Sequence, residues 1–266
     1  MSSSARQPNP VQRCTATVRR WAVGSAVMVL VCAPSAQSSA DRYFSANGVR
    51  IRYIDVGSGP PVVLVHGRTG GLQPFIDVGF VANMAKDHRV IALDLRGHGK
   101  SDRPSAAAYA GQLTGDITRL LDHLSLPRAH LVGYSLGGAL VAKLVTEHPD
   151  RLLTATIAAS GGHRLSRFRS ESSRDIADDT NPFEVYYRAG HRDTYFADED
   201  FAAAKVPVLG IVGSEDGSLA GMKELQTLLP TMALVVIQGA THVGPKNAPA
   251  RPEFAQAIRD FINVRR

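Results

Sequence analysis

The sequence predicts one α/β domain with a mostly parallel central sheet flanked by helices. The chain has 266 residues, which suits one large domain with a sizeable core. Short apolar runs alternate with segments of helical periodicity over most of residues 41–266. The polar segment from about 161 to 205 interrupts this alternation. We therefore expect a domain over 41–266 with a small lid insertion. The insertion either contacts a substrate or is a solvent-exposed loop without substrate contact.

The first 40 residues have the pattern of an export signal. A basic, polar region runs to Arg20, an uncharged and mostly apolar dozen follows over 22–33, and small residues precede Asp41. A dozen residues is too short to span a bilayer, which takes about 20. We expect a cleaved or disordered leader, no stable membrane span after export, and a periplasmic or secreted protein.

The export route is open at this point. The pair Arg19-Arg20 resembles a twin-arginine signal, whereas the residues after it fit a general secretory signal better. A lipid anchor on Cys32 and an uncleaved N-terminal anchor are the other interpretations. Both cysteines of the chain, Cys14 and Cys32, lie in this leader. The remaining chain therefore lacks disulfides, thiolate zinc sites and cysteine nucleophiles.

The charge of the chain gives no argument for a nucleic-acid partner. The formal net charge is +6, and four arginines without any acid lie in the first 40 residues. Residues 41–266 therefore carry only +2. A nearly neutral body lacks the basic surface that binds phosphate backbones.

The elements of the first half follow from hydrophobic periodicity and turn residues. Asn47-Gly48 lies between two alternating runs, which is typical of a β-hairpin. In order, we expect a hairpin over 43–56, a strand over 62–65, a helix over 74–87, a strand over 89–94 and a helix over 111–124.

The second half continues the same pattern around the polar insertion. In order, we expect a strand over 129–132, a helix over 138–147, a strand over 153–159, a strand over 206–213, a helix over 221–229, a strand over 233–237 and a closing helix from Pro252. Within the insertion, the segment 183–187 is the best candidate for a helix.

A nucleophile turn is predicted between the strand over 129–132 and the helix that follows it. Gly133-Tyr134-Ser135-Leu136-Gly137 fits the pattern Gly-x-Ser-x-Gly, and a strand, a sharp turn and a helix are the context that this pattern requires. The glycines leave room where a Cβ would clash. The serine hydroxyl is thereby exposed above the edge of the sheet.

With these residues in hand, the chain from about residue 43 to 262 resembles the α/β-hydrolase superfamily. Five segments agree in their order along the chain: His66-Gly67, Asp94 to Ser101, Gly133 to Gly137, Gly213 to Asp216, and Gly239 to His242. In this family the nucleophile, acid and histidine follow in that order. The resemblance implies the triad Ser135, Asp216 and His242, and the neighbouring Glu215 is the alternative acid.

The triad residues have the chemistry that acyl transfer needs. A serine hydroxyl is a weak nucleophile at neutral pH, so His242 would take its proton and return it to the leaving group. Asp216 would hold the imidazole tautomer and stabilise its cation. By resemblance, the backbone N–H groups of Leu136 and Arg68 form the oxyanion hole.

Other polar residues have a second interpretation. The Arg68 side chain either attracts a substrate carboxylate or points to solvent. His66 and His98 are interpreted as loop or surface histidines, and Asp94 as a residue that fixes its loop by hydrogen bonds. We predict no metal and no cofactor, because the acidic residues of the insertion lack a ligand spacing. They are Asp178, Asp179, Asp198, Glu199 and Asp200.

The leading hypothesis is a serine hydrolase that cleaves small to medium carboxylic esters or lactones through an acyl-enzyme. A serine at position 135 argues against haloalkane dehalogenases and epoxide hydrolases, which need a carboxylate nucleophile. A carbon–carbon bond or enol-lactone hydrolase with the same triad is the alternative. A noncatalytic binding protein on the same scaffold is the hypothesis from another class. We expect a small-molecule substrate and, by default, a monomer.

Overall fold

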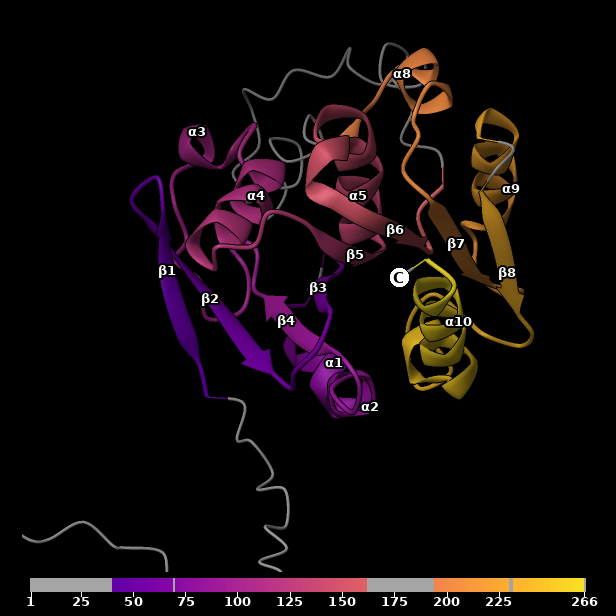
Figure 1. Ribbon diagram of the computed structural model, residues 1–266, viewed down its shortest axis with the longest axis horizontal. Coiled ribbons are helices and arrows are strands. Elements are labelled where there is room, and N and C mark those ends of the chain that lie inside the picture. Colours follow the sequence, from indigo (N-terminus) through magenta and orange to yellow (C-terminus); the bar gives the residue numbers. More distant parts are fainter. Residues whose placement is uncertain (1–39, 69, 162–193, 230–231, 266) are drawn as a thin grey trace, which may run out of the picture. The chain divides into compact units, whose positions relative to one another are not determined.

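A central sheet with eight strands organises the described part of the chain (Figure 1). The computed structural model describes residues 40–68, 70–161, 194–229 and 232–265. The order across the sheet is β1-β2-β4-β3-β5-β6-β7-β8. The strands are β1 (Arg42–Ala46), β2 (Val49–Val56), β3 (Pro61–Val65), β4 (Arg89–Leu93), β5 (Ala129–Tyr134), β6 (Leu152–Ala158), β7 (Val208–Gly213) and β8 (Ala233–Ile237).

The sheet is mostly parallel, as predicted. Only the pairs of β2 with β1 and with β4 are antiparallel, and every later pair is parallel. Asn47 and Gly48 join β1 to β2 with φ values of 51° and 81°, so both adopt the left-handed conformation of a tight hairpin turn. The predicted hairpin is therefore confirmed.

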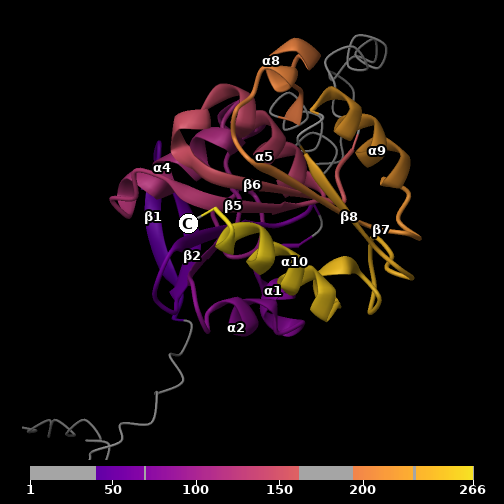
Figure 2. The same cartoon turned by 45° about the vertical axis from the view of Figure 1, so that its right-hand side comes forward.

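Helices cover both faces of this sheet (Figures 1 and 2). One hydrophobic cluster includes residues of α4, α5, α8 and α9, and a second includes residues of α1, α2 and α10 on the other face. The helices are α1 (Gln73–Asp77), α2 (Phe80–Met84), α3 (Ala106–Tyr109), α4 (Leu113–His123), α5 (Leu136–Glu147), α8 (Asp198–Ala202), α9 (Leu219–Leu228) and α10 (Pro252–Asn263), with 3-10 turns at Pro149–Arg151 and Ala248–Ala250.

The continuous apolar run of β3 serves both hydrophobic clusters. Successive side chains of a strand point to opposite faces of the sheet. Val63 and Val65 accordingly pack in the cluster with α4 and α5, while Val62 and Leu64 pack in the cluster with α1, α2 and α10. All four side chains are fully buried. A strand that lies between two layers of helices needs such a run rather than strict alternation.

The helix expected over residues 74–87 is wrong as a single element. The structure has the two short helices α1 and α2 there, separated at Gly79, whose φ of 73° is incompatible with a right-handed helix. Phe75, Phe80 and Val81 still face the core, because each short helix keeps its own apolar side. Val78, which precedes the glycine, is exposed, so one apolar stripe does not run through both helices.

The predicted insertion lies mostly outside the described residues. Its expected helix over 183–187 falls there, so that prediction is not tested. In the described remainder, α8 begins with Asp198, Glu199 and Asp200 and buries Phe201 fully. Glu199 and Asp200 are exposed to solvent. Acidic side chains suit the first turn of a helix because the N–H groups at that end carry partial positive charge.

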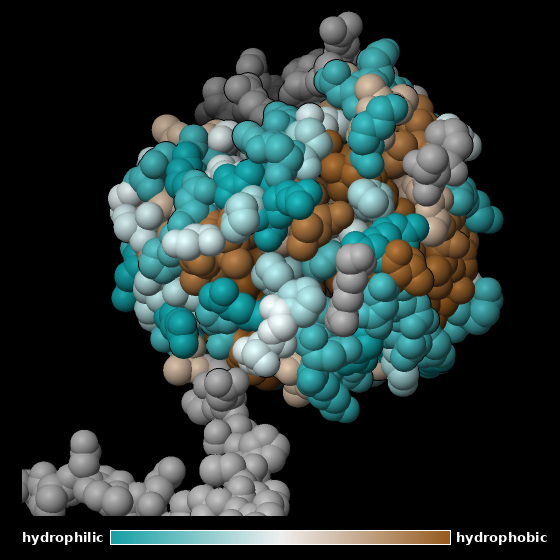
Figure 3. Space-filling model, in the orientation of Figure 1, coloured by the Kyte–Doolittle hydropathy of each residue, from teal (hydrophilic) through white to brown (hydrophobic). Residues whose placement is uncertain are grey.

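The edge strand β8 is incompletely covered. It ends the strand order, and its residues 234–236 are only half-buried. Hydrophobic residues accordingly gather on the surface near β8 (Figure 3).

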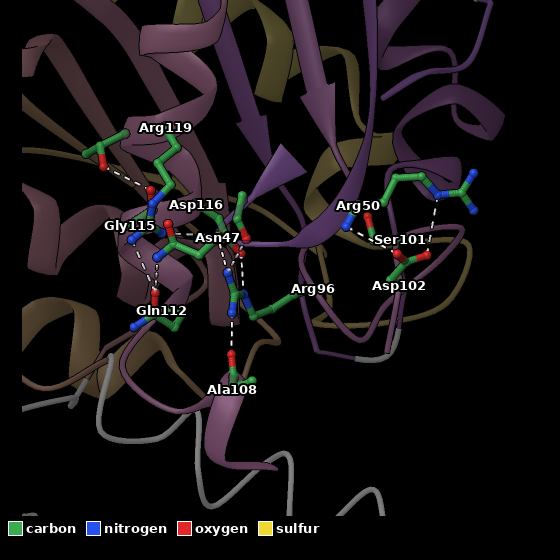
Figure 4. Close-up of polar contacts among 12 residues, drawn as sticks. Asn47, Arg50, Arg96, Ser101, Asp102, Ala108, Gln112, Gly115, Asp116 and Arg119 are labelled. Carbon is green, nitrogen blue, oxygen red and sulfur yellow. Dashed lines mark hydrogen bonds and ion pairs between the residues drawn. The ribbon is translucent and has the colours of Figure 1, made fainter. Parts of the chain in front are cut away.

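In the loop after β4, Arg96 is buried and forms an ion pair with Asp116 of α4 at 2.5 Å (Figure 4). None of the helices in the described part of the chain combines the length and the apolar character of a membrane span.

Candidate active site

Ser135 lies in the sharp turn between β5 and α5. Its φ of 55° and ψ of −115° are unusual for a residue with a side chain and cost about 1–3 kcal/mol. Backbone contacts stabilise this conformation: the Ser135 N–H donates to the Ala158 carbonyl at 2.9 Å. A Cβ on Gly133 would lie 2.1 Å from the Gly137 carbonyl oxygen, so only glycine fits there.

The structure brings the three residues of the predicted triad together. Ser135 Oγ lies 2.9 Å from His242 Nε2, and His242 Nδ1 lies 3.0 Å from both carboxylate oxygens of Asp216. A carboxylate only accepts hydrogen bonds, so Nδ1 must carry the proton. Nε2 is then free to accept the serine hydroxyl proton. These residues come from the ends of β5, β7 and β8, at the carboxyl edge of the parallel strands.

Asp216 rather than Glu215 faces the imidazole. Asp216 is buried, whereas Glu215 is exposed. Burial alone raises the pKa of the Asp216 carboxyl, but hydrogen bonds from His242 and Ser218 outweigh it and lower that pKa below the ordinary value. Ser218 donates to Asp216 Oδ1 with its backbone N–H at 2.8 Å and with its hydroxyl at 2.7 Å. The carboxylate is therefore ionised at neutral pH.

Two residues that the sequence did not suggest fix this arrangement. The Tyr134 hydroxyl donates to the His242 carbonyl at 2.6 Å, and its ring packs on the imidazole with 5.6 Å between centroids. Burial and the nearby Asp216 charge raise the Tyr134 pKa, so this hydroxyl stays protonated and keeps donating. Ser218 is the second such residue. Its place two positions after the acid is the one signal for it, because an aspartate side chain often accepts the backbone N–H two residues further on.

The predicted oxyanion donors lie on two segments that meet at the nucleophile. Leu136 is the first residue of α5, so its N–H has no carbonyl acceptor within that helix. Arg68 follows Gly67, where an added Cβ would lie only 3.2 Å from Ser135 Cβ. The N–H of Gly137 donates to the His66 carbonyl at 3.1 Å and joins the two segments. Their role as oxyanion donors remains a prediction.

A cavity of about 470 Å³ opens beside the Ser135 hydroxyl. Apolar side chains of α1 and its surroundings form much of its wall, among them Phe75, Val78 and Val243. Val243 is 70% exposed at this wall. Arg68 is the one residue of permanent charge among the described residues that line the cavity, and its side chain is exposed. Cavities of this size accept small organic ligands.

The remaining sequence predictions concern loop residues and metals. Asp94 is fully buried and accepts hydrogen bonds from the Leu72 N–H, the Lys100 N–H and the Arg52 guanidinium. Its predicted role in fixing its loop is confirmed. His66 and His98 lie in the same region, with ring centroids 5.1 Å apart. Among the residues that the structure describes, no group of three or more His, Cys, Asp or Glu could hold a metal ion.

Two curated proteins resemble about half of this chain in sequence. A dihydrolipoyllysine-residue acetyltransferase component of an acetoin cleaving system from Pseudomonas putida is 36% identical over 132 residues, which are 49% of this chain and 35% of that protein. A 2-hydroxymuconate semialdehyde hydrolase from Pseudomonas sp. (strain CF600) is 34% identical over 132 residues, covering 49% of this chain and 47% of the relative. The matched region thus spans about half the length, or less, of these curated relatives.

A solved structure extends the likeness over most of the chain. An enol-lactonase from Burkholderia xenovorans LB400 superposes with a TM-score of 0.67 over 84% of this chain and 100% of that one, at 23% identity. At this identity the likeness concerns the fold alone. The sequence model of the alpha/beta hydrolase fold family matches residues 60–216, which include Ser135 and Asp216. The chain therefore belongs to the alpha/beta hydrolase fold family.

Proposed function

We propose that this protein is a serine hydrolase that cleaves small to medium carboxylic esters or lactones through an acyl-enzyme. One observation carries the proposal: Ser135 Oγ lies within hydrogen-bonding distance of His242 Nε2, while Asp216 holds the opposite ring nitrogen. This is the arrangement that activates a serine nucleophile. The strained turn exposes the hydroxyl to the cavity in which a substrate would bind.

The reaction follows from the proton positions. Ser135 Oγ attacks the ester carbonyl carbon while His242 Nε2 takes the hydroxyl proton, and the resulting imidazolium is stabilised by Asp216. Collapse of the tetrahedral intermediate breaks the carbon–oxygen bond, and His242 gives the proton to the leaving alkoxide. A water molecule then attacks the acyl-enzyme with His242 as the base, and the second tetrahedral intermediate collapses: the carboxylic acid leaves, and His242 returns the proton to Ser135 Oγ.

The negative oxygen of each tetrahedral intermediate would accept hydrogen bonds from the N–H groups of Leu136 and Arg68. Such donors are fixed before the reaction and stabilise charge that develops only in the transition state. Removing one donor typically costs about 10²–10³ in kcat. The proximity of Gly67 to Ser135 supports this assignment.

The cavity supports a substrate of limited size with an apolar part. Its volume of about 470 Å³ lies in the range for small organic ligands. Phe75, Val78 and Val243 offer apolar contacts to an acyl or ring group. We propose a small-molecule substrate and, by default, a monomer. For localisation we propose export to the periplasm or medium with loss of a leader ending near Ala40, which N-terminal sequencing of the exported protein would test.

A carbon–carbon bond or enol-lactone hydrolase is the second candidate. It is favoured by one named relative, a 2-hydroxymuconate semialdehyde hydrolase, and by the structural likeness to an enol-lactonase. Both reactions can use the same serine, histidine and aspartate. Assay of 2-hydroxymuconate semialdehyde beside simple esters separates the candidates, because a carbon–carbon hydrolase would show the higher kcat/KM on the former.

The test of the leading proposal is turnover of p-nitrophenyl acetate and butyrate by the wild type and Ser135→Ala. We expect the variant to keep its fold, measured by circular dichroism, and to lose at least about 10³ in kcat. Equal rates for the two proteins would remove the Ser135 mechanism. No turnover of any ester by the wild type, with tight binding of a small molecule, would instead support a noncatalytic binding protein.

A further inference from the structure

His66 joins the two loops that flank the proposed reaction centre. It follows β3 directly and is buried, with 2% of its surface exposed. The Leu95 N–H lies 3.0 Å from its Nε2, and its Nδ1 lies 2.6 Å from the carbonyl oxygen of Gly67. The ring is therefore hydrogen-bonded on both sides, once to the loop after β4 and once to the loop after β3.

These contacts select one protonation state of the ring. A backbone N–H can only donate, so Nε2 of His66 must accept from Leu95 and carry no proton. Nδ1 then bears the proton and donates to the Gly67 carbonyl. Burial, together with the nearby His98, lowers the pKa of His66 to about 4, against the opposing effect of Asp94. His98 and Asp94 are the titratable groups whose charges act on this ring, and it is neutral at neutral pH.

The Gly67 carbonyl and the Arg68 N–H belong to the same peptide group. A peptide group is planar and trans, so its C=O and N–H point in opposite directions and turn together. We propose that His66 is a positioning residue for the oxyanion hole, an inference that rests on the proposed function. By holding the Gly67 carbonyl, its imidazole directs the Arg68 N–H toward the substrate oxygen. His66 itself touches no reacting atom.

The loop after β4 provides a fixed support for this contact. Next to Leu95, Arg96 is buried and paired with Asp116, and its guanidinium also donates to the Ala108 carbonyl (Figure 4). On the other side of Leu95, Asp94 accepts the Leu72 N–H at 2.6 Å. The segment 94–96 therefore holds the loop after β3 at both ends, through His66 at its start and through Leu72 at its end.

Two amide substitutions separate the two hydrogen bonds of His66. In His66→Asn the side-chain amide can reach the place of Nδ1 and donate to the Gly67 carbonyl. In His66→Gln the amide oxygen can reach the place of Nε2 and accept from Leu95, but donation to Gly67 is lost. With p-nitrophenyl butyrate, we expect His66→Gln to lose about 10² in kcat with KM within about threefold, which is the loss for one oxyanion donor. His66→Asn should stay within about tenfold of the wild-type kcat.

The comparison of the two variants keeps this inference separate from the proposed function. Wild-type turnover that disappears in Ser135→Ala, combined with equal kcat losses in the two His66 variants or a loss confined to KM, overturns the inference alone. A wild type without esterase activity overturns the proposed function. Thermal unfolding of both variants shows whether a loss of kcat follows only from a loss of folded protein.

A measurement on the wild type needs no variant to fold. Long-range ¹H–¹⁵N correlation spectra of histidine-labelled protein distinguish a ring protonated at Nδ1 from one protonated at Nε2 or at both nitrogens. We expect His66 to be neutral and protonated at Nδ1 at pH 7. A cationic ring, or a proton on Nε2, would overturn the inference because Leu95 would then face a second donor.

Discussion

Two loops meet at the Ser135 hydroxyl, and different forces hold them. Backbone packing fixes the nucleophile turn, since a Cβ on Gly133 would collide with the chain at 2.1 Å. Buried polar side chains fix the loop after β3, through His66 at its start and Asp94 at its end. The first loop therefore depends on the absence of side-chain atoms, and the second on the charge and protonation of side chains. Substitutions and pH should affect the two loops differently.

The largest expected effect comes from removing the charge that holds the end of the loop after β3. Asp94 is fully buried and pairs with Arg52 at 3.1 Å. Asp94→Asn leaves Arg52 with Asp41 as its ionised partner and sets an amide N–H group against a backbone N–H that a carboxylate oxygen now accepts, so it should lower the free energy of unfolding by about 3–5 kcal/mol. Urea unfolding measures this loss. The same change at Asp102, which is half-exposed and pairs with Arg50, should cost less than about 1 kcal/mol. Similar losses in both variants would show that burial of Asp94 is unimportant.

A methyl group tests the sterically held turn. Gly133→Ala places a Cβ against the backbone at Gly137, and the chain must shift to relieve the contact. We expect a loss of about 3 kcal/mol in unfolding free energy, at the upper end for overpacking, together with a large fall in kcat. Gly217→Ala is the control, because nothing lies within 4 Å of its Cβ position. A Gly133→Ala protein as stable and active as that control would contradict the steric account.

Low pH should lower the stability of the loop after β3, which buried polar side chains hold in place. The pKa of His66 is about 4 in the folded protein and about 6.5 when unfolded, so the unfolded state binds the extra proton first as pH falls. The stability that the neutral ring contributes is complete above pH 6.5 and is lost on the way down to about pH 4. The loss amounts to roughly 3 kcal/mol at 1.4 kcal/mol per pKa unit.

Unfolding midpoints measured from pH 7 to pH 4 check this window. His66→Gln cannot titrate there, so the difference in stability between wild type and variant should shrink as pH falls. A difference that stays constant over the range would mean that the ring has an ordinary pKa in the folded protein.

The smallest expected effect comes from removing the hydrogen bond between the Tyr134 hydroxyl and the His242 carbonyl. Tyr134→Phe removes the hydrogen bond to the His242 carbonyl and keeps the ring packing. We expect a loss of about 1 kcal/mol in unfolding free energy and a fall of a few-fold in kcat. Steady-state kinetics with p-nitrophenyl butyrate measure the second quantity. An unchanged kcat would show that the loop of His242 keeps its place without this bond.

The sequence was informative where glycine and apolar patterns decide the local structure. Asn47-Gly48 predicted the hairpin, the run at 62–65 predicted the central strand, and Gly133 to Gly137 predicted the turn at Ser135. The three side chains at 135, 216 and 242 meet because each ends or follows a parallel strand at one edge of the sheet. The resemblance to the α/β-hydrolase superfamily implied this triad, and the parallel sheet explains why its members converge.

Other features depend on contacts that a local pattern does not contain. The bond from Leu95 to His66 links positions 29 apart, and no periodicity predicts which ring nitrogen accepts it. The break at Gly79 depends on a backbone angle that a helical apolar pattern conceals. No local pattern marks Tyr134, because its bond to His242 spans 108 positions. Such residues are found only when the folded arrangement is known.

The most direct test of the central claim is the site of covalent modification. Diethyl p-nitrophenyl phosphate is attacked as an ester is, but its phosphoryl-enzyme hydrolyses slowly, so the adduct can be mapped by peptide mass spectrometry. We predict one diethylphosphoryl group per chain on Ser135, loss of esterase activity in step with labelling, and no adduct in Ser135→Ala. Full inhibition with the adduct on another residue, or ester turnover by a wild type that is never labelled, would contradict the account.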